Sequence, residues 1–231
     1  MAVFVIGDLH LSQNGAKPMD IFPGWKNHRE RLEYNWKRRV SDSDTIVLAG
    51  DSSWAMTFEQ ALPDFLWINS LPGKKILLKG NHDYWWGSLT SMNQSLEAAG
   101  ISSISFLYNN SYFADGINLC GSRGWLFETG QEHDTKIIRR EAMRIEASLK
   151  SARDNAAPAV LFLHYPPVYA DQEISAFLEL IRSYGIQRCY YGHIHGAGCR
   201  GAVQGMFRGV QLRLVSSDYT EFDLVPVKLD I

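Results

Sequence analysis

The chain has 231 residues, of which 45% are hydrophobic and 21% are charged, and its formal net charge is -2. This composition excludes long disordered and fibrous proteins, and the length suits an α/β domain that folds without a disulfide or a structural metal. Because non-specific nucleic-acid binding depends on many Lys and Arg contacts to phosphates, the charge disfavours a dedicated nucleic-acid binder.

Short apolar runs, each followed at once by polar residues, occur at five places along the chain. Runs of four or five residues that include β-branched side chains are typical of strands buried on both faces, as in parallel sheets. The runs cover residues 2–6 before GDLH, 45–49 before GDSSW, 75–79 before GNHDYWW, 159–163 before His164, and 188–191 before GHIH.

Helical spacing of apolar residues appears between these runs. It predicts helices around residues 58–65 and 174–181, and a longer one over 138–149 with Asp134 or Thr135 as its cap. The mainly charged segment 28–40 is also expected to be helical. Alternation of strands and helices predicts βαβ units with right-handed crossovers, and therefore an α/β fold.

Further short strands are predicted in the middle and near the end of the chain, joined by turns that contain Gly, Asn or Asp. They cover residues 103–107, 111–114, 118–120, 203–207, 211–216 and 219–225. We expect antiparallel hairpins that extend the sheets. Because no repeat, low-complexity tract or Pro/Ser-rich linker interrupts the chain, one domain over residues 1–231 is expected.

The cysteines and the apolar segments indicate the compartment. Three cysteines without CxxC spacing argue against a disulfide framework or a thiolate zinc site. The start MAVFVIGDLH has no basic region and too short an apolar run for a signal peptide, and no stretch reaches the ~18 apolar residues of a membrane span. We expect a soluble cytoplasmic protein without a membrane partner; the sequence carries no signal for an oligomeric state.

The polar clusters after the five runs supply the chemistry. Ligands of open α/β sheets bind beyond the carboxyl ends of the strands, so clusters far apart in sequence can meet in one crevice. Five of the seven histidines lie in these clusters, which is hard to explain by turns and caps alone. Imidazole, carboxylate and amide groups without thiolate suit Mn²⁺, Fe or Zn²⁺ better than Ca²⁺ or Cu(I). The clustered residues are Asp8, His10, Asp51, Asn81, His82, Asp83, His164, His193 and His195.

The spacing within the clusters also has a mechanical reading. On an extended segment, Asp8 and His10 would point to the same side and hold one ion, and so would His193 and His195. Glycine precedes Asp8, Asp51 and Asn81, which would let the backbone approach the ions closely.

The motifs GDLH, GD, GNHD, a later strand-end His and GHIH, in this order over residues 7–195, resemble those of calcineurin-like metallophosphoesterases, specifically a small bacterial-type single-domain member. The resemblance implies a four-layer α/β/β/α sandwich with two mixed β-sheets and a site for two divalent ions, Mn²⁺ or Fe before Zn²⁺, at the strand ends. It assigns Asp8, His10 and His195 to one ion and Asn81, His164 and His193 to the other, with Asp51 bridging both.

The same resemblance gives His82 the role of the histidine beside the leaving group, which binds no metal, and Asp83 that of its hydrogen-bonding partner. The alternative expectation for Asp83 is that it only caps a helix. Two ions lower the pKa of a bridging water, whose hydroxide would attack phosphorus in line while His82 protonates the leaving oxygen. Many family members read GDxxD in the second motif, whereas this chain has Trp54 at the second acidic position, which puts outer support of Asp51 in doubt.

Substrate contacts are expected from the aromatic residues Trp54 and Trp85, from Asn81, and from Arg123, whose guanidinium could grip a phosphate. The aromatic rings could stack a nucleobase or simply pack the strand ends. The long connection over residues 11–27, with Lys17, Trp25 and Lys26, is a candidate lid. We expect hydrolysis of a small phosphodiester or phosphomonoester, nucleotide-like in one reading; the alternatives are a nuclease and an inactive protein-binding scaffold.

Overall fold

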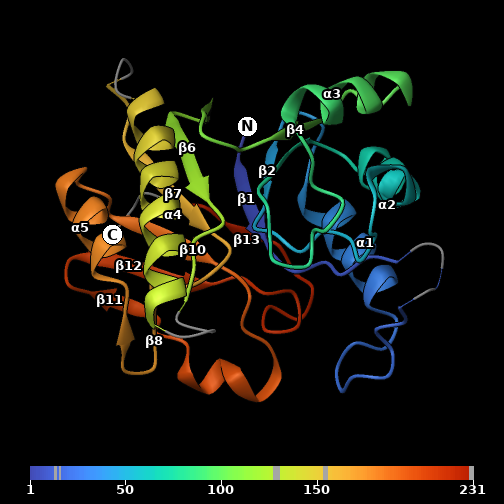
Figure 1. Cartoon of the computed structure of the whole chain (residues 1–231). Coiled ribbons are helices and arrows are strands. Elements are labelled where there is room, and N and C mark those ends of the chain that lie inside the picture. The colour runs from blue at the N-terminus through green and yellow to red at the C-terminus, as the bar shows by residue number, and fades with distance from the viewer. Residues whose placement is uncertain (13–14, 16, 127–130, 153–155, 229–231) are drawn as a thin grey trace.

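Two β-sheets form the centre of the molecule in a computed structural model that describes residues 1–12, 15, 17–126, 131–152 and 156–228 (Figure 1). The first sheet has the order β13-β1-β2-β3-β4 and the second β11-β12-β10-β7-β6-β5. The strands of the first sheet are β1 (Val3–Ile6), β2 (Thr45–Leu48), β3 (Lys74–Leu77), β4 (Ile104–Phe106) and β13 (Val225–Pro226). Those of the second are β5 (Ser111–Ala114), β6 (Ile117–Ser122), β7 (Ala159–Leu163), β10 (Arg188–Tyr191), β11 (Gly205–Phe207) and β12 (Val210–Leu214).

Helices cover the outer face of each sheet (Figure 1). The first sheet carries α1 (His28–Arg39), α2 (Phe58–Ser70) and α3 (Leu89–Ala98), and the second carries α4 (Gln131–Ser151) and α5 (Ser175–Ser183). A small hairpin of β8 (Val168–Tyr169) and β9 (Gln172–Glu173) and a 3₁₀ helix, η1 (Gly196–Gly201), complete the regular elements. No described helix is long and apolar enough to cross a membrane.

Alternation along the strands explains the layers, because neighbouring side chains of a strand point to opposite faces. In β2, Ile46 packs in one apolar cluster with Trp36 of α1, whereas Val47 lies in a second cluster with Phe162 of β7. Leu161 of β7 belongs to a third cluster that includes helices α4 and α5. The three clusters fill the three spaces between four layers, so the expected α/β/β/α sandwich with two mixed sheets is confirmed.

The strand ends of both sheets are brought to one edge by parallel pairing. In the first sheet β1, β2, β3 and β4 run parallel, and in the second β6, β7, β10 and β12 do so. The antiparallel strands β13, β5 and β11 lie at the outer edges. The polar clusters follow β1, β2, β3, β7 and β10, and therefore share this edge.

Some local predictions are wrong. The strand expected at 103–107 pairs parallel to β3 rather than in a hairpin, and most of segment 219–225 forms turns, with only Val225–Pro226 in a strand. Helix α4 begins at Gln131, before the expected caps. Helix α3 was not predicted; its signal is Ser88, whose hydroxyl accepts the backbone N–H of Ser91 at 3.2 Å.

Candidate dimetal active site

The chain leaves the strands through sharp turns rather than extended segments. Asp8, His10, Asp51 and His193 all have positive φ, at 60°, 47°, 52° and 71°. The left-handed region is sparsely populated by residues with a side chain, and such strain concentrates at functional sites. The expectation that Asp8 and His10 share a side through strand alternation is therefore wrong: left-handed turns direct them to the site.

Two glycines bring the backbone close to the carboxylates of the site. A Cβ atom on Gly80 would overlap the carboxylate of Asp51, and one on Gly192 would overlap that of Asp8. These absent side chains leave the space in which the two carboxylates lie, both almost wholly buried. Glycine is thus required here by contact between loops that are far apart in sequence.

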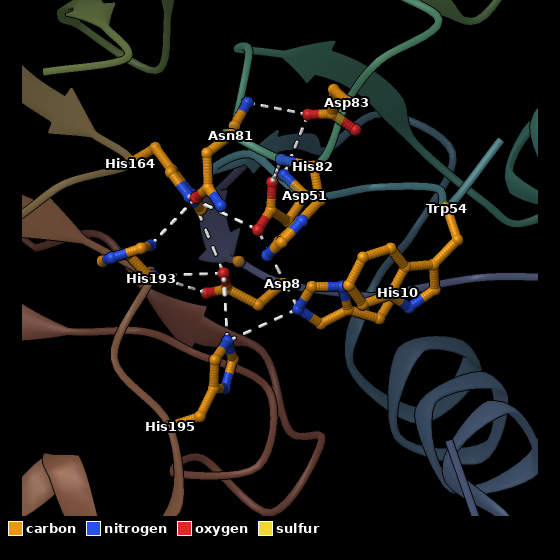
Figure 2. Close-up of polar contacts among 12 residues, drawn as sticks. Asp8, His10, Asp51, Trp54, Asn81, His82, Asp83, His164, His193 and His195 are labelled. Atoms are coloured by element: carbon orange, nitrogen blue, oxygen red, sulfur yellow. Dashed lines mark hydrogen bonds and ion pairs between the residues drawn. The ribbon is translucent and has the colours of Figure 1, made fainter. Parts of the chain in front are cut away.

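One group of potential ligands consists of Asp8, His10 and His195, each of which offers a ligand atom within 4.8 Å of the others. The Nε2 atoms of His10 and His195 face one another at 3.4 Å, and Nε2 of His195 lies 3.4 Å from Oδ1 of Asp8 (Figure 2). The structure therefore brings together the three residues that the motifs assign to one ion.

The second group lies across Asp51. Nε2 of His164 is 3.4 Å from Oδ2 of Asp51 and 2.6 Å from Oδ1 of Asn81, and the same Asn81 oxygen lies 2.9 Å from Nδ1 of His193 (Figure 2). Oδ2 of Asp51 is also 3.9 Å from Nε2 of His10, so this carboxylate reaches toward both groups. The Asp8 carboxylate also reaches toward both groups, because its Oδ1 lies 3.7 Å from Nδ1 of His164 in the second group.

Burial and neighbouring carboxylates together shift the pKa values of the site residues. Burial lowers the pKa of His164 to about 3 and that of His10 well below its usual value, so both imidazoles are neutral and retain a lone pair at neutral pH. Burial also raises the pKa of Asp51, and the nearby carboxylates of Asp83 and Asp8 raise it further. For His195 burial opposes charge, yet the carboxylates of Asp8 and Asp218 outweigh it and raise the pKa to about 10.

The donor set fits two divalent ions. Ligands that share an ion at ~2.0–2.2 Å stand on the order of 3–3.5 Å apart, close to the separations between the facing atoms here. The ion pairs found among the described residues for Asp8 and Asp51 are all with histidines, none with Lys or Arg. Buried carboxylates whose ion-pair partners are all imidazoles favour the additional positive charge of a metal ion.

Asp83 neither pairs with His82 nor caps a helix, but binds backbone N–H groups of two loops. Its buried carboxylate accepts the backbone N–H groups of Asp51, Ser52 and Gly80 at 2.9, 2.9 and 2.7 Å. It also accepts the indole N–H of Trp85 at 3.0 Å. The predicted pairing with His82 is wrong, and so is the cap, because α3 begins at Leu89. Asp83 holds the Asp51 loop against the Asn81 loop.

His82 lies at the edge of the ligand cluster. Its ring centroid is 5.8 Å from that of His10 and 4.4 Å from that of Trp54 (Figure 2). Its Nδ1 is 3.4 Å from the Tyr84 hydroxyl. Its backbone N–H donates to Oδ1 of Asp51 at 2.7 Å. Burial and the neighbouring His193 lower its pKa. The ring is thus near both groups of potential ligands and belongs to neither of them.

The predicted substrate contacts separate into two kinds. Trp54 stacks on His10 at 4.7 Å and borders a cavity, so it can meet a substrate. Trp85 is 3% exposed and packs against Phe65 in the core, so its predicted substrate contact is wrong. The guanidinium of Arg123 lies 3.7 Å from the carboxylate of buried Glu141 in α4. The backbone carbonyl of Arg123 accepts the backbone N–H of His164 at 3.1 Å. Arg123 therefore supports a ligand loop.

Sequence reasoning missed two acidic residues of the site, Asp218 and Asp64, and did not place Trp25 against the ligand histidines. Asp218 accepts Nδ1–H of His195 at 2.8 Å and the backbone N–H of Gly196 at 2.9 Å. Buried Asp64 of α2 accepts the hydroxyl of Ser53, and so supplies outer support after the GD motif from another element. Trp25, within the candidate lid, contacts the rings of both His10 and His195. The acidic residues lie 13 and 23 residues from the motifs that they support, too far for a spacing signal.

Comparisons with known proteins agree with the fold and the motifs. The family model described as calcineurin-like phosphoesterase matches residues 1–197. Solved structures that resemble the chain include a phosphopantetheinyl hydrolase from Mycobacterium tuberculosis, with a TM-score of 0.59, 14% identity, and coverage of 99% of this chain and 96% of that one. The protein TT1561 of Thermus thermophilus has a TM-score of 0.59 at 12% identity, with coverage of 99% of this chain and 98% of that one.

A protein of unknown function from Aquifex aeolicus gives a TM-score of 0.53 at 15% identity, covering 97% of this chain and 95% of that one. No curated protein matches the sequence. At these identities the solved structures support the fold, whereas the family model covers most of the chain and its motifs. The chain belongs to the calcineurin-like phosphoesterase family and is a metal-dependent phosphoester hydrolase.

Proposed function

We propose that the protein hydrolyses small phosphomonoesters or phosphodiesters with two divalent ions, one held by Asp8, His10 and His195 and the other by Asn81, His164 and His193, with Asp51 between them. The observation that carries this proposal is that the Asp51 carboxylate lies between two groups of ligand atoms, 3.4 Å from His164 and 3.9 Å from His10. Mn²⁺ or Fe is the proposed metal, with Zn²⁺ next, because imidazole and carboxylate ligands without thiolate suit these ions.

The bound ions would supply Lewis acidity to the phosphoryl group and acidify a water. The protein itself supplies position and protons. The side-chain amide of Asn81 and the ring of His82 can donate to phosphoryl oxygens, where negative charge develops. His82 is half-buried beside the ligands, and its lowered pKa makes the protonated ring a stronger acid toward the leaving oxygen while reducing the protonated fraction at neutral pH. Asp83 and Asp218 hold the ligand loops in place through their hydrogen bonds.

The test is metal analysis of the purified protein together with hydrolysis of p-nitrophenyl mono- and diesters under Mn²⁺ supplementation. Asp51→Asn should lose both activity and at least one equivalent of metal, while the exposed control Asp42→Asn should keep both. A wild-type protein that binds no Mn²⁺ and hydrolyses neither ester would contradict the proposal and favour the scaffold alternative.

Nuclease activity, with DNA or RNA as the substrate, is the alternative, and the net charge of -2 weighs against it.

Cys120, Cys189 and Cys199 are free thiols, which supports a cytoplasmic location, because reducing compartments keep thiols unpaired. The site draws ligands from both sheets, which supports a single domain over residues 1–231.

A further inference from the structure

A cavity of about 460 Å³ opens beside the ligand cluster, a volume typical of small-molecule sites. The site residues that border it are His10, His82 and His195. None of Asn81, His164 and His193 is among its lining residues, so the cavity lies on the His10–His195 side of the site. Any group that fills it would be attached to a phosphate held between the ligands and His82.

The remaining walls of this cavity are largely apolar. Met19, Phe22, Pro23 and Trp25 come from the segment that follows β1, and Trp54 comes from the segment that follows β2. Trp25 and Met19 are buried, whereas Phe22 is 49% exposed at the mouth. The indole of Trp54 donates to the sulfur of Met19 at 3.3 Å, which ties the two segments together. The cavity is thus a formed apolar recess.

Few polar groups line this recess. Asp218 is the only carboxylate among the described lining residues, and it accepts hydrogen bonds from His195 and from Gly196. No Lys or Arg is among them. Lys17 lies outside the lining, with its Nζ 4.5 Å from the centre of the Trp54 ring. A nucleobase would bury most of its edge N–H and C=O groups against apolar walls, where few hydrogen-bond partners stand.

We propose that the recess binds the apolar ester group of the substrate, so that the preferred substrates are phosphoesters of an aryl or alkyl alcohol, with the apolar group next to His82. This inference rests on the proposed function and names its substrate class. Burying apolar surface in the recess contributes binding in proportion to the area removed from water.

The test uses p-alkylphenyl phosphates and their methyl diesters, with the alkyl group lengthened from hydrogen to butyl. These phenols have nearly equal acidity, so reactivity stays constant while apolar volume grows. In the ester class that is hydrolysed, kcat/KM should rise by up to about fourfold for each methylene until the recess is full, the fold-change that corresponds to ~0.8 kcal/mol. Nucleoside monophosphates should be poorer substrates than the butyl ester.

Two variants tie the effect to the recess. Ala197→Phe places a ring at an exposed lining position and should flatten the dependence of kcat/KM on alkyl length. Phe22→Ser removes part of the wall and should weaken the dependence. Ile21→Ser, a neighbour that is 73% exposed and outside the lining, is the matched control and should leave it unchanged.

The outcomes separate the two proposals. Efficient hydrolysis of every ester without dependence on alkyl length, or a preference for nucleoside monophosphates, would overturn the apolar recess and leave the proposed function standing. No hydrolysis of any ester by metal-loaded protein would instead overturn the proposed function.

Discussion

The carboxylate of Asp83 accepts the backbone N–H of Asp51 at 2.9 Å, across 32 positions of sequence. The same carboxylate binds the N–H groups of Ser52 and Gly80, so the two loops that carry Asp51 and Asn81 are joined through one side chain. Burial disfavours the charged form of this carboxylate and raises the pKa of Asp83 to about 6, although the hydrogen bonds from the backbone N–H groups oppose the shift.

Asp83→Asn should destabilise the protein and disturb the site. Both carboxylate oxygens accept N–H groups, so either orientation of an amide would set its NH₂ against buried donors, at ~1–3 kcal/mol for each donor left unsatisfied. We expect a lower free energy of unfolding in urea and weaker metal binding. Asp115→Asn, in an exposed turn, is the control. Unchanged stability and metal content would show that Asp83 does not hold the loops.

His82→Asn should reduce turnover by ~10²–10⁴-fold, because the variant lacks the ring that can donate a proton to the leaving oxygen. Metal content should stay intact, since His82 belongs to neither ligand group. The measurements are kcat on p-nitrophenyl esters and metal analysis of the same preparation. Tyr84→Phe, which removes the hydroxyl 3.4 Å from the ring, is a matched control with a small expected effect. Wild-type turnover in His82→Asn would remove His82 from the chemistry.

Asp218→Ala should weaken metal binding by ~10–100-fold, the usual consequence of losing the partner that orients a ligating histidine. Asp218 accepts Nδ1–H of His195 and thereby turns Nε2 toward Asp8 and His10. Titration of apoprotein with Mn²⁺ measures the effect, and excess Mn²⁺ should restore most of kcat. The exposed Asp171→Asn should behave like wild type. Equal affinity in both variants would mean that His195 needs no orienting partner.

Lys75 predicts a pH dependence of stability that has no connection with the active site. Burial lowers its pKa from 10.5 to about 8. Between these pH values the unfolded chain binds more protons than the folded one, so the free energy of unfolding should rise with pH from about 8 to 10.5. Lys75→Met should lack this rise in urea titrations, whereas exposed Lys74→Met should retain it. Parallel curves for Lys75→Met and wild type would contradict the prediction.

The contribution of the sequence is clearest at the strand ends. Each ligand follows a buried apolar run, and parallel pairing places the ends of β1, β2, β3, β7 and β10 at one edge, so local patterns were enough to select Asp8, Asp51 and His164 as neighbours. The directions in which the ligand side chains point could not be predicted from these local patterns. Asp8 and His10 adopt left-handed conformations, which strand alternation does not anticipate.

The two tryptophans that follow ligand motifs show what depends on packing alone. Trp54 borders the recess, whereas Trp85 lies in the core beneath α2, and nothing in the residues around them separates the two cases. Arg123 likewise looks like a phosphate ligand in sequence, but α4 presents Glu141 to it. Each outcome depends on which helix lies against which loop.

The sequence by itself determined the family and the four-layer fold and selected the candidate metal ligands, because those features follow from short motifs at the ends of strands whose hydrophobic pattern is local. Only the tertiary structure decided that Asp83, Asp64 and Asp218 support the ligands. It also showed that one side of the site is an apolar recess. The physical reason is that hydrogen bonds and cavity walls form between elements remote in sequence, where no spacing rule relates the partners.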